Sequence, residues 1–312
     1  MIVISSINGK LGLPEAMKVM KEGGSALDAV ETSTRLVELN AKDHSVGLGG
    51  LPNVLGDVRL DAAIMDGRSL RAGAVGSVRN CIHVISLARK VMEESPHVLL
   101  VGDGAERFAR EMAQESTDLL TTEAKVRWQA GLSKRFPELE TSELEGHADL
   151  TSLVRGLNEP MAGWEPEDPH GTVNFLAQDR DGNLASAVST SGWPWGYPGR
   201  LGDSPIISAG SYADNRYGAA ASTGTGEVQL RTAGARSTIL YVKMGMSLPE
   251  AVKEALRDLK DLHDPYTDHI AMIALNRDGN HTGYAHRPDD RYAVMSAGME
   301  EPEEYPMPAP GQ

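Results

Sequence analysis

Short runs rich in apolar residues, each pair separated by a polar turn, predict two β-hairpins in the second half of the chain. Strand-like runs at 173–178 and 184–188 flank one turn, and runs at 270–275 and 282–285 flank another. Short turns rich in Asp, Gly and Asn between such runs are a strong local signal for a hairpin. Both turns contain the tetrapeptide Arg-Asp-Gly-Asn, which indicates shared turn chemistry rather than an internal sequence repeat.

Helical spacing of apolar residues predicts helices, and two of them carry clear start signals. Ser25 opens a short acidic capping box, and Ser247 precedes a proline and a glutamate in a box of the same kind. In the first of these two helices, Ala29, Val30 and Ser33 share one face, which predicts close packing on that side. The predicted helices cover 14–20, 26 to about 41, 86–94, 234–244 and 248–259.

Short apolar runs predict strands in the first third of the chain. They cover 1–4, 60–67 and 97–101, and the last run is apolar enough for a buried strand. The segment 102–107 follows this strand and precedes a helix, as a dinucleotide-binding loop does, but Arg107 occupies the third glycine position of that motif. We therefore favour a plain strand-to-helix turn and keep nucleotide binding as the alternative.

Two segments lack clear periodicity. Residues from about 114 to 168 include acidic and proline-bearing runs, which predict a solvated acidic linker or, as the alternative, a specific acidic binding surface. The tail from about residue 300 contains four prolines and four glutamates, a composition that predicts disorder.

The order of these elements predicts an α+β fold. Hairpins and helices are grouped along the chain rather than strictly alternating, which fits stacked sheets covered by helices. A length of 312 residues allows one large domain or two ordinary ones.

Composition narrows the possible partners and the compartment. The chain has 44 acidic and 30 basic residues and a net charge of −14, which argues against nucleic acid as a partner. The single cysteine, Cys81, excludes an intrachain disulfide, fits a reducing cytoplasm, and is more simply a structural thiol than a nucleophile. No apolar run approaches the roughly 20 residues of a membrane-spanning helix. We expect a cytoplasmic protein without a membrane partner, and removal of a leader before residue 1 stays open.

Thr172 is the first candidate for catalytic chemistry, because it follows Gly171 at the start of the first hairpin. We predict that the chain is cut between these two residues and that Thr172 becomes a new N-terminus. A threonine hydroxyl alone is a poor nucleophile, but a free α-amino group, with a pKa of about 7.7–8.0, can serve as its base. The alternative is a β-branched residue that only starts a strand.

Other motifs supply what such a nucleophile needs. Thr190 ends the second strand of the hairpin, beside the start of the first, so its hydroxyl can reach Thr172. Arg200 and Asp203 place a cation and an anion in one loop, which suits a zwitterionic ligand, with a surface ion pair as the alternative. The run 223–226 offers hydroxyls and unhindered N–H groups for an oxyanion hole, or is a flexible turn.

A series of ordered motifs extends over most of the chain outside the acidic linker and the tail. They lie at 23–31, 45–47, 60–67, 170–173, 181–185, 189–192, 199–205, 209–210, 212–214 and 223–227. Together they resemble the threonine N-terminal-nucleophile (Ntn) asparaginase family, which includes glycosylasparaginases, isoaspartyl peptidases and plant-type asparaginases.

The resemblance implies a four-layer αββα sandwich of the Ntn-hydrolase type in a single domain that spans residues 1–312. It implies autocatalytic cleavage into 1–171 and 172–312, and assembly of two copies of each fragment as an (αβ)₂ heterotetramer. Thr172 is then the nucleophile, with Thr190 hydrogen-bonded to it. The reaction is hydrolysis of the β-amide of a small asparagine-type substrate through a β-aspartyl ester, and neither a cofactor nor a metal is implied.

The resemblance also assigns residues to substrate binding. Arg200 contacts the substrate α-carboxylate, and Asp203 contacts the α-amino group. Thr223 and Gly224 form the oxyanion hole, and Gly226 lies on the same substrate-binding side.

The motifs leave the leaving group open among a glycosylamine, ammonia and an amino acid. Segments 45–52 and 86–108 resemble glycosylasparaginases most, whereas 225–227 resembles the plant-type branch. Glycosylasparaginases have a substrate-contacting tryptophan near the N-terminus, and the corresponding region 6–9 here reads Ser-Ile-Asn-Gly. Isoaspartyl peptidase or L-asparaginase activity is therefore the alternative to glycosylasparaginase.

Two further alternatives concern the aromatic residues and the class of protein. Trp193 and Trp195 either line the leaving-group side of the site or pack at an interface. A catalytically silent member that acts as a binding protein is the alternative from another functional class.

Overall fold

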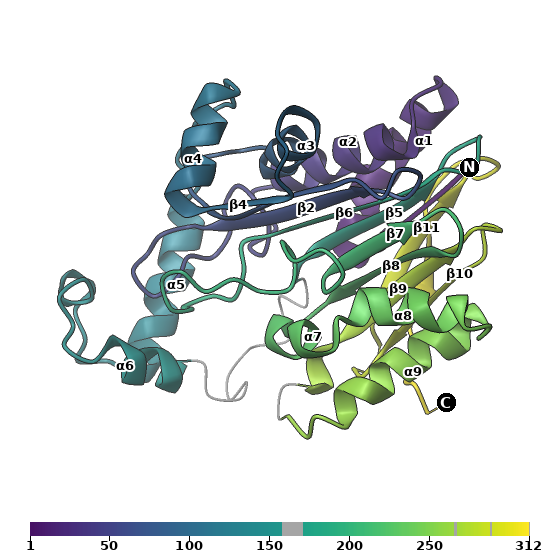
Figure 1. Ribbon diagram of the computed structural model, residues 1–312. Helices are drawn as coiled ribbons and strands as arrows, with labels where there is room; N and C mark the ends of the chain where they lie inside the picture. The colour runs from purple at the N-terminus through teal and green to yellow at the C-terminus, as the bar shows by residue number, and fades with distance from the viewer. Residues whose placement is uncertain (158–170, 265–266, 288, 312) are drawn as a thin grey trace.

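Two β-sheets lie face to face, and helices cover both of their outer faces (Figure 1). The computed structural model describes residues 1–157, 171–264, 267–287 and 289–311. Helices from the N-terminal part of the chain form one outer layer, and helices from the second half form the other. This arrangement confirms the predicted α+β class and the four-layer αββα sandwich.

The secondary structure within the described residues is as follows. The α-helices are α1 (Leu13–Lys21), α2 (Ala26–Glu38), α3 (Val84–Glu94), α4 (Gly102–Glu111), α5 (Thr122–Arg135), α6 (Leu150–Leu157), α7 (Gly226–Thr232), α8 (Gly234–Lys243) and α9 (Leu248–Lys260). The strands are β1 (Ile2–Ser6), β2 (Leu60–Asp66), β3 (Ala72–Val78), β4 (Leu99–Val101), β5 (Val173–Gln178), β6 (Leu184–Thr190), β7 (Ser211–Asp214), β8 (Gly218–Thr223), β9 (Ala271–Asn276), β10 (His281–Ala285), β11 (Arg291–Ser296) and β12 (Glu303–Pro306). The short 3₁₀ helices are η1 (Ile7–Gly12), η2 (Thr141–Glu143) and η3 (Thr267–His269).

Both predicted hairpins form, and the first lies at the centre of the larger sheet. In the described chain the larger sheet has the strand order β12-β11-β1-β5-β6-β2-β3-β4, and the smaller sheet has the order β10-β9-β8-β7. The antiparallel register pairs Val173 of β5 with Ser189 of β6, and pairs Thr190 of β6 with Asp61 of β2. The N-terminal end of β5 therefore lies beside the C-terminal end of β6.

Apolar side chains fill each interface between layers. Successive residues of a strand point to opposite faces, and here both faces of the central strands are covered. Val3 and Phe175 pack toward the N-terminal helices, whereas Ile4 and Leu176 pack between the two sheets. Met272 of β9 belongs to a third cluster, between the smaller sheet and helices α8 and α9. This double burial explains why the central strands read as nearly continuous apolar runs.

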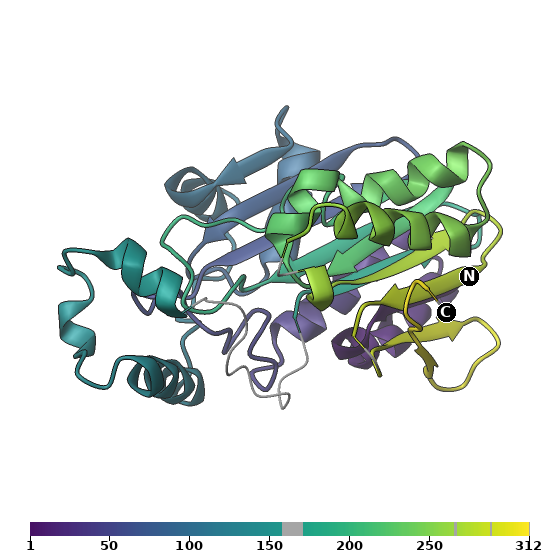
Figure 2. The same cartoon turned by 90° about the horizontal axis from the view of Figure 1, so that it is seen from below.

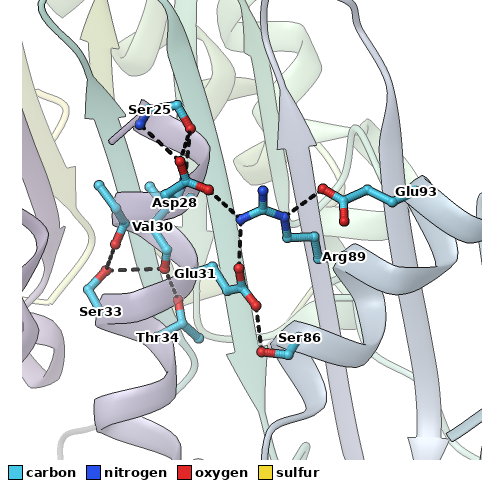
Figure 3. Close-up of polar contacts among 10 residues, drawn as sticks. Ser25, Asp28, Val30, Glu31, Ser33, Thr34, Ser86, Arg89 and Glu93 are labelled. Atoms are coloured by element: carbon cyan, nitrogen blue, oxygen red, sulfur yellow. Dashed lines mark hydrogen bonds and ion pairs between the residues drawn. The ribbon is translucent and has the colours of Figure 1, made fainter. Parts of the chain in front are cut away.

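The predicted capping box at Ser25 is present and is linked to the neighbouring helix (Figure 3). The Ser25 hydroxyl accepts a hydrogen bond from the Asp28 backbone N–H, and the Asp28 carboxylate accepts one from the Ser25 N–H. Arg89 of α3 donates to Asp28 and Glu31 of α2, and to Glu93 of its own helix, each at 2.7 Å. This network joins α2 to α3 at the outer face of the larger sheet.

The prediction of a solvated acidic linker from about 114 to 168 is wrong over much of that range. Helices α5 and α6 occupy 122–135 and 150–157, and in Figures 1 and 2 these teal helices extend away from the sheets at one end. They form their own small core, in which Trp128, Leu132 and Leu153 pack with Val54 from a distant loop. The sequence pattern did not show this because the partner loop lies far away in the chain. The rest of the linker, from 158 to 168, falls outside the described residues.

The prediction that the tail is disordered is also wrong. Strand β12 pairs antiparallel with β11 at the edge of the larger sheet, and Met307 is 5% exposed. Glu304 forms ion pairs with Lys10 at 2.6 Å and with Arg291 at 3.1 Å. An edge strand tolerates prolines and charges, because one side of its backbone needs no sheet partner. The composition of the tail was therefore a poor guide to its order.

The predicted buried strand at 97–101 is instead a short edge strand. Only β4 is strand there, it runs parallel to β3, and Val101 is 47% exposed. The sequence pattern also missed β3, β7, β8, β11 and α7. Small residues such as Ala219 to Ala221 allow β8 to fit between the other sheet and α8, but they carry weak strand propensity.

Helix α4 begins at Gly102, directly after β4, so the segment 102–107 is the predicted strand-to-helix junction. Nucleotide binding at this junction stays an untested hypothesis. Within the described ranges, no helix is both long enough and apolar enough to cross a membrane.

Cys81 is a free cysteine that is 2% exposed and packs in the core beneath the N-terminal helices. Burial raises the pKa of its thiol to about 12, so the thiol is protonated at neutral pH. Because the thiolate is the reactive form, this environment fits the structural role predicted for the residue.

Candidate active site

A cavity of about 160 Å³ opens at strand ends from both sheets. The starts of β5 and β9 and the ends of β6 and β8 contribute to its wall. Loops from the first half of the chain, the segment between β6 and β7, and the region after β10 also contribute to it. Most of the sequence-predicted site residues line this cavity, namely Gly171, Thr172, Thr190, Arg200, Asp203, Thr223 and Gly224.

Thr172 lies immediately before β5 and is 8% exposed. Its hydroxyl is 3.4 Å from the hydroxyl of Ser204, within hydrogen-bonding distance. Gly171 lies on the exposed side, where its carbonyl oxygen accepts hydrogen bonds from the Asn8 side-chain amide at 2.9 Å and from the Ser45 hydroxyl at 2.7 Å. The Gly171–Thr172 peptide bond is thus at the cavity wall, with its carbonyl held by two side chains.

Thr190 lies beside Thr172, as the hairpin predicts, but its hydrogen bonds differ from those expected. Its hydroxyl donates to the Ser45 carbonyl at 3.4 Å and accepts from the Gly192 N–H at 3.0 Å. Over the residues that the structure describes, no hydrogen bond joins the hydroxyls of Thr172 and Thr190. Ser204 occupies the position next to the nucleophile candidate that we expected Thr190 to fill.

Arg200 is held in the cavity wall by Glu227, not by Asp203. Its Nε and Nη2 donate to the two carboxylate oxygens of Glu227, each at 2.8 Å, and its guanidinium lies 5.6 Å from the centre of the Trp193 ring. The surface-pair alternative is therefore wrong, because the Arg200 side chain is only 20% exposed. Burial opposes the charge, but the hydrogen bonds and charge of Glu227 raise the pKa of Arg200 above its ordinary value.

The pairing with Glu227 leaves part of the guanidinium available to a ligand. A guanidinium has five N–H donors, and the two nitrogens that face Glu227 commit only part of that set. The Nη1 atom faces the glycine loops at Gly192 and Gly202. A carboxylate on that side of the cavity would meet a positioned, permanently charged donor.

Two buried carboxylates lie near Arg200. Burial raises the pKa of Asp203 to about 6, against the opposing effects of a hydrogen bond from the Ser222 hydroxyl and the charge of Arg200. Burial also raises the pKa of Asp61 to about 6, although its carboxylate accepts a 2.7 Å hydrogen bond from the Ser77 N–H. Asp203 lines the cavity, so at neutral pH it presents a negative charge to a cationic group of a ligand.

Removing the buried charge at Asp203 should stabilise the protein at neutral pH. The pKa of Asp203 is raised from 3.8 to about 6 on folding, so the folded state binds more protons than the unfolded chain within that window. The free energy of unfolding therefore falls as the pH rises from the unfolded pKa of 3.8 through the folded pKa of about 6, by up to about 3 kcal/mol at pH 7.5. We expect Asp203→Asn to melt at a higher temperature than wild type at pH 7.5 but not at pH 4.0. The exposed-turn variant Asp278→Asn is the control, and an identical shift at both pH values would contradict the prediction.

Thr223 ends β8, Gly224 follows it directly, and both residues line the cavity. Gly224 has φ +114°, and a Cβ there would lie 1.7 Å from the His269 carbonyl oxygen, so only glycine fits. Gly226 has another role: it is buried at the start of α7, and its Cβ would lie 2.8 Å from the Asp203 backbone nitrogen. It lets α7 approach the Asp203 loop and is not among the residues that form the cavity wall.

The two tryptophans have separate environments. Trp195 packs in the α5–α6 core, where its indole N–H donates to the Trp128 carbonyl at 3.1 Å. Trp193 lines the cavity beside Arg200. Of the two tryptophans, Trp193 is the one available to a ligand in this cavity.

Several cavity residues escaped the sequence analysis. His269, Arg287 and Asp290 come from segments around β9 and β10 and meet the β5–β6 residues only in the fold. The Arg287 guanidinium donates to Nδ1 of His269 at 2.7 Å through its Nε. The only local signal was the charged Arg-Pro-Asp-Asp run at 287–290, which reads as an ordinary turn.

The fold and the cavity define an N-terminal-nucleophile type of sandwich with a threonine at the start of a central strand, and sequence comparisons identify its family. The family model described as Asparaginase matches residues 10–301. The chain belongs to this asparaginase family and is an amidohydrolase.

Individual relatives carry different activities in their names. The chain is 37% identical over 305 residues to an N(4)-(Beta-N-acetylglucosaminyl)-L-asparaginase of Elizabethkingia miricola, covering 94% of this chain and 81% of the relative. It is 40% identical over 246 residues to an isoaspartyl peptidase/L-asparaginase of Mus musculus, covering 79% and 69%. It is 38% identical over 281 residues to a plant-type L-asparaginase of Pyrococcus furiosus, covering 90% and 86%.

Proposed function

We propose that the chain cuts itself between Gly171 and Thr172 and then hydrolyses the β-amide of asparagine-type substrates with Thr172 as the nucleophile. The observation that carries this proposal is the position of Thr172. It is a buried threonine at a strand start, in one cavity with a charged Arg200 and a buried Asp203. A ligand with both an α-carboxylate and an α-ammonium group would meet complementary charges on that wall.

In the proposed first half-reaction, the free α-amine of Thr172 accepts the proton of its own hydroxyl. The hydroxyl oxygen attacks the β-carbonyl carbon of the substrate, and the carbonyl oxygen becomes an oxyanion. The Thr223 hydroxyl and the Gly224 N–H donate to that oxyanion. The C–N bond then breaks, and the departing amine takes the proton from the Thr172 ammonium, leaving a β-aspartyl ester.

In the second half-reaction, a water molecule replaces the amine. The α-amine of Thr172 accepts a proton from the water as its oxygen attacks the ester carbon. The C–O bond to Thr172 breaks, the hydroxyl regains a proton, and aspartate is released. Arg200 and Asp203 hold the α-substituents throughout, which keeps the reacting carbon beside the nucleophile.

The leading candidate substrate is a glycosylasparagine, because similarity to the glycosylasparaginase relative extends over 94% of this chain. A β-aspartyl peptide is the second candidate, and Arg287 is the observation that favours it. This guanidinium lines the same cavity as Thr172 and is oriented by His269. The carboxylate of a departing amino acid would find a charged donor there, whereas a neutral sugar amide or ammonia would not need one.

Side-by-side assays would distinguish these substrates. Asparagine, a β-aspartyl dipeptide and GlcNAc-asparagine should be compared by kcat/KM with wild type and Arg287→Gln. If the dipeptide is the substrate, the variant should lose about 10-fold or more for it, since a hydrogen bond to a charged group is worth about 1.5–3 kcal/mol. Turnover of asparagine should change little. Equal effects on all three substrates would remove Arg287 as a specificity determinant.

We propose that the cleaved chain assembles as an (αβ)₂ heterotetramer in the cytoplasm, with no cofactor, no nucleic-acid partner and no membrane partner. The sequence resemblance supports the assembly and the absence of a cofactor. The single cysteine supports the cytoplasmic location, the acidic net charge argues against nucleic acid, and the lack of a long apolar run argues against a membrane-spanning helix. The alternative of another class is a catalytically silent binding protein. A purified chain that stayed uncut and inactive on all three substrates would support that alternative.

A further inference from the structure

Two side chains already hold the carbonyl that self-cleavage would attack. The Gly171 carbonyl oxygen accepts from Nδ2 of Asn8 at 2.9 Å and lies within hydrogen-bonding distance of Oγ of Ser45, at 2.7 Å. Asn8 lies in η1 just after β1, and Ser45 lies in the loop after α2. These donors approach from segments 163 and 126 residues away in the chain, so the fold brings them to this oxygen.

The amide of Asn8 is fixed at both ends. Its Oδ1 accepts from the Ser6 hydroxyl at 2.8 Å, and the Ser6 hydroxyl in turn accepts from the Asn174 N–H at 3.0 Å. Its Nδ2 has two protons and two acceptors, Gly171 and the Asp43 carboxylate at 2.9 Å. This pattern sets the orientation of the amide and directs one N–H at the scissile carbonyl.

Asp43 holds the second donor as well. It is 6% exposed, and its Oδ1 accepts from the Ser45 hydroxyl at 2.5 Å and from the Ser45 N–H at 3.0 Å. The Ser45 hydroxyl has one proton and two acceptors, the Asp43 carboxylate and the Gly171 carbonyl. An amide carbonyl is the weaker acceptor, but it becomes an oxyanion during the reaction. The proton of Ser45 can then turn toward it, so this contact strengthens as the transition state forms.

We propose that Asn8 and Ser45 form the oxyanion hole for self-cleavage and that Asp43 is the residue that positions both. The proposal rests on the self-cleavage proposed above. This hole is distinct from the Thr223–Gly224 pair assigned to substrate turnover, because its donors touch the carbonyl of the chain itself.

The chemistry is an N-to-O acyl shift followed by hydrolysis. The Thr172 hydroxyl oxygen bonds to the Gly171 carbonyl carbon, and the electron pair of the C=O bond moves to the oxygen held by Asn8 and Ser45. The C–N bond then breaks, and the Thr172 nitrogen takes up the proton lost by the hydroxyl. Water opens the resulting ester, which yields the Gly171 carboxylate and returns the hydroxyl of Thr172.

The test is the rate at which newly made chain is cut. Chain from cell-free synthesis is sampled over time on denaturing gels, and the fraction of uncut 1–312 is followed. Loss of one oxyanion donor costs about 100- to 1,000-fold in buried sites. Because Gly171 is exposed, we expect Asn8→Ala and Ser45→Ala to cut about 10- to 100-fold more slowly than wild type.

Matched variants separate this role from a structural one. Asn280→Ala, in an exposed hairpin turn, should cut at the wild-type rate. Ser45→Thr keeps the hydroxyl and should cut faster than Ser45→Ala. This comparison tests the proposal even if Asn8→Ala does not fold. For Asp43→Ala, slow cutting at an unchanged melting temperature would identify a positioning role.

The outcomes distinguish the two proposals. If wild type remains uncut, self-cleavage itself fails. If wild type is cut, while Asn8→Ala and Ser45→Ala are cut within about threefold of its rate, self-cleavage stands and this oxyanion hole is overturned.

Discussion

Thr172→Ala should abolish both chain cleavage and amide hydrolysis. The substitution removes the hydroxyl that attacks the Gly171 carbonyl and the one that attacks the substrate. The variant should run as one uncut chain of 312 residues and release no ammonia or aspartate from any of the three substrates. Loss of a covalent nucleophile typically lowers kcat by about 10⁴-fold or more, so only background hydrolysis should remain.

Thr172→Ser is the matched control, because it retains a hydroxyl and can expose the same α-amine. We expect Thr172→Ser to be cut and to keep measurable hydrolytic activity, at rates that differ from those of wild type. If Thr172→Ala hydrolysed any of the substrates at a rate near wild type, the nucleophile would have to be another residue, and Ser204 at 3.4 Å would be the first to examine.

Arg200→Ala should lower kcat/KM for asparagine-type substrates by roughly 2–5 kcal/mol, or about 30- to 5,000-fold. The Arg200 side chain is 20% exposed, so little water would replace the lost contact with the α-carboxylate. The substitution also leaves Glu227 without its ion-pair partner in the cavity wall. Steady-state kinetics on cleaved protein would measure the loss.

Two variants separate substrate binding by Arg200 from its pairing with Glu227. Arg200→Lys keeps the charge but not the planar pair of donors, so it should recover only part of the activity. Glu227→Gln keeps a hydrogen-bond acceptor and should cost much less than Arg200→Ala. An unchanged kcat/KM in Arg200→Ala would exclude the carboxylate role.

The features that could be predicted from sequence depend on neighbours in the chain. The hairpin turns, the cap at Ser25 and the start of α9 at Ser247 are encoded within a few residues, and all three are present. The motif resemblance extended this to the sandwich and to the cavity residues Thr172, Arg200 and Asp203. Local turn and cap chemistry and a family pattern were therefore sufficient for the centre of the fold.

The features that escaped prediction depend on contacts between distant segments. The α5–α6 core needs Val54, and β12 needs the edge of β11 and the side chain of Lys10. Such pairings leave no periodic signal in the segment itself. Sequence composition therefore described these segments as solvated, although tertiary contacts order them.

The same reason applies within the site. The alternative for Arg200 was a surface ion pair with Asp203, three positions away, but the fold pairs it with Glu227 in the first turn of α7. Asn8 and Ser45 reach Gly171 only because β1 pairs with β5 in the larger sheet and α2 packs on that sheet. Sequence reasoning found the residues with family motifs and missed those that hold them in place.

N-terminal sequencing of the purified protein tests the central claim most directly. If the chain cuts itself before Thr172, two sequences should appear in equal amounts, one from the original N-terminus and one beginning Thr-Val-Asn-Phe. A single sequence beginning at the original N-terminus, from protein that hydrolyses a β-amide, would contradict the account.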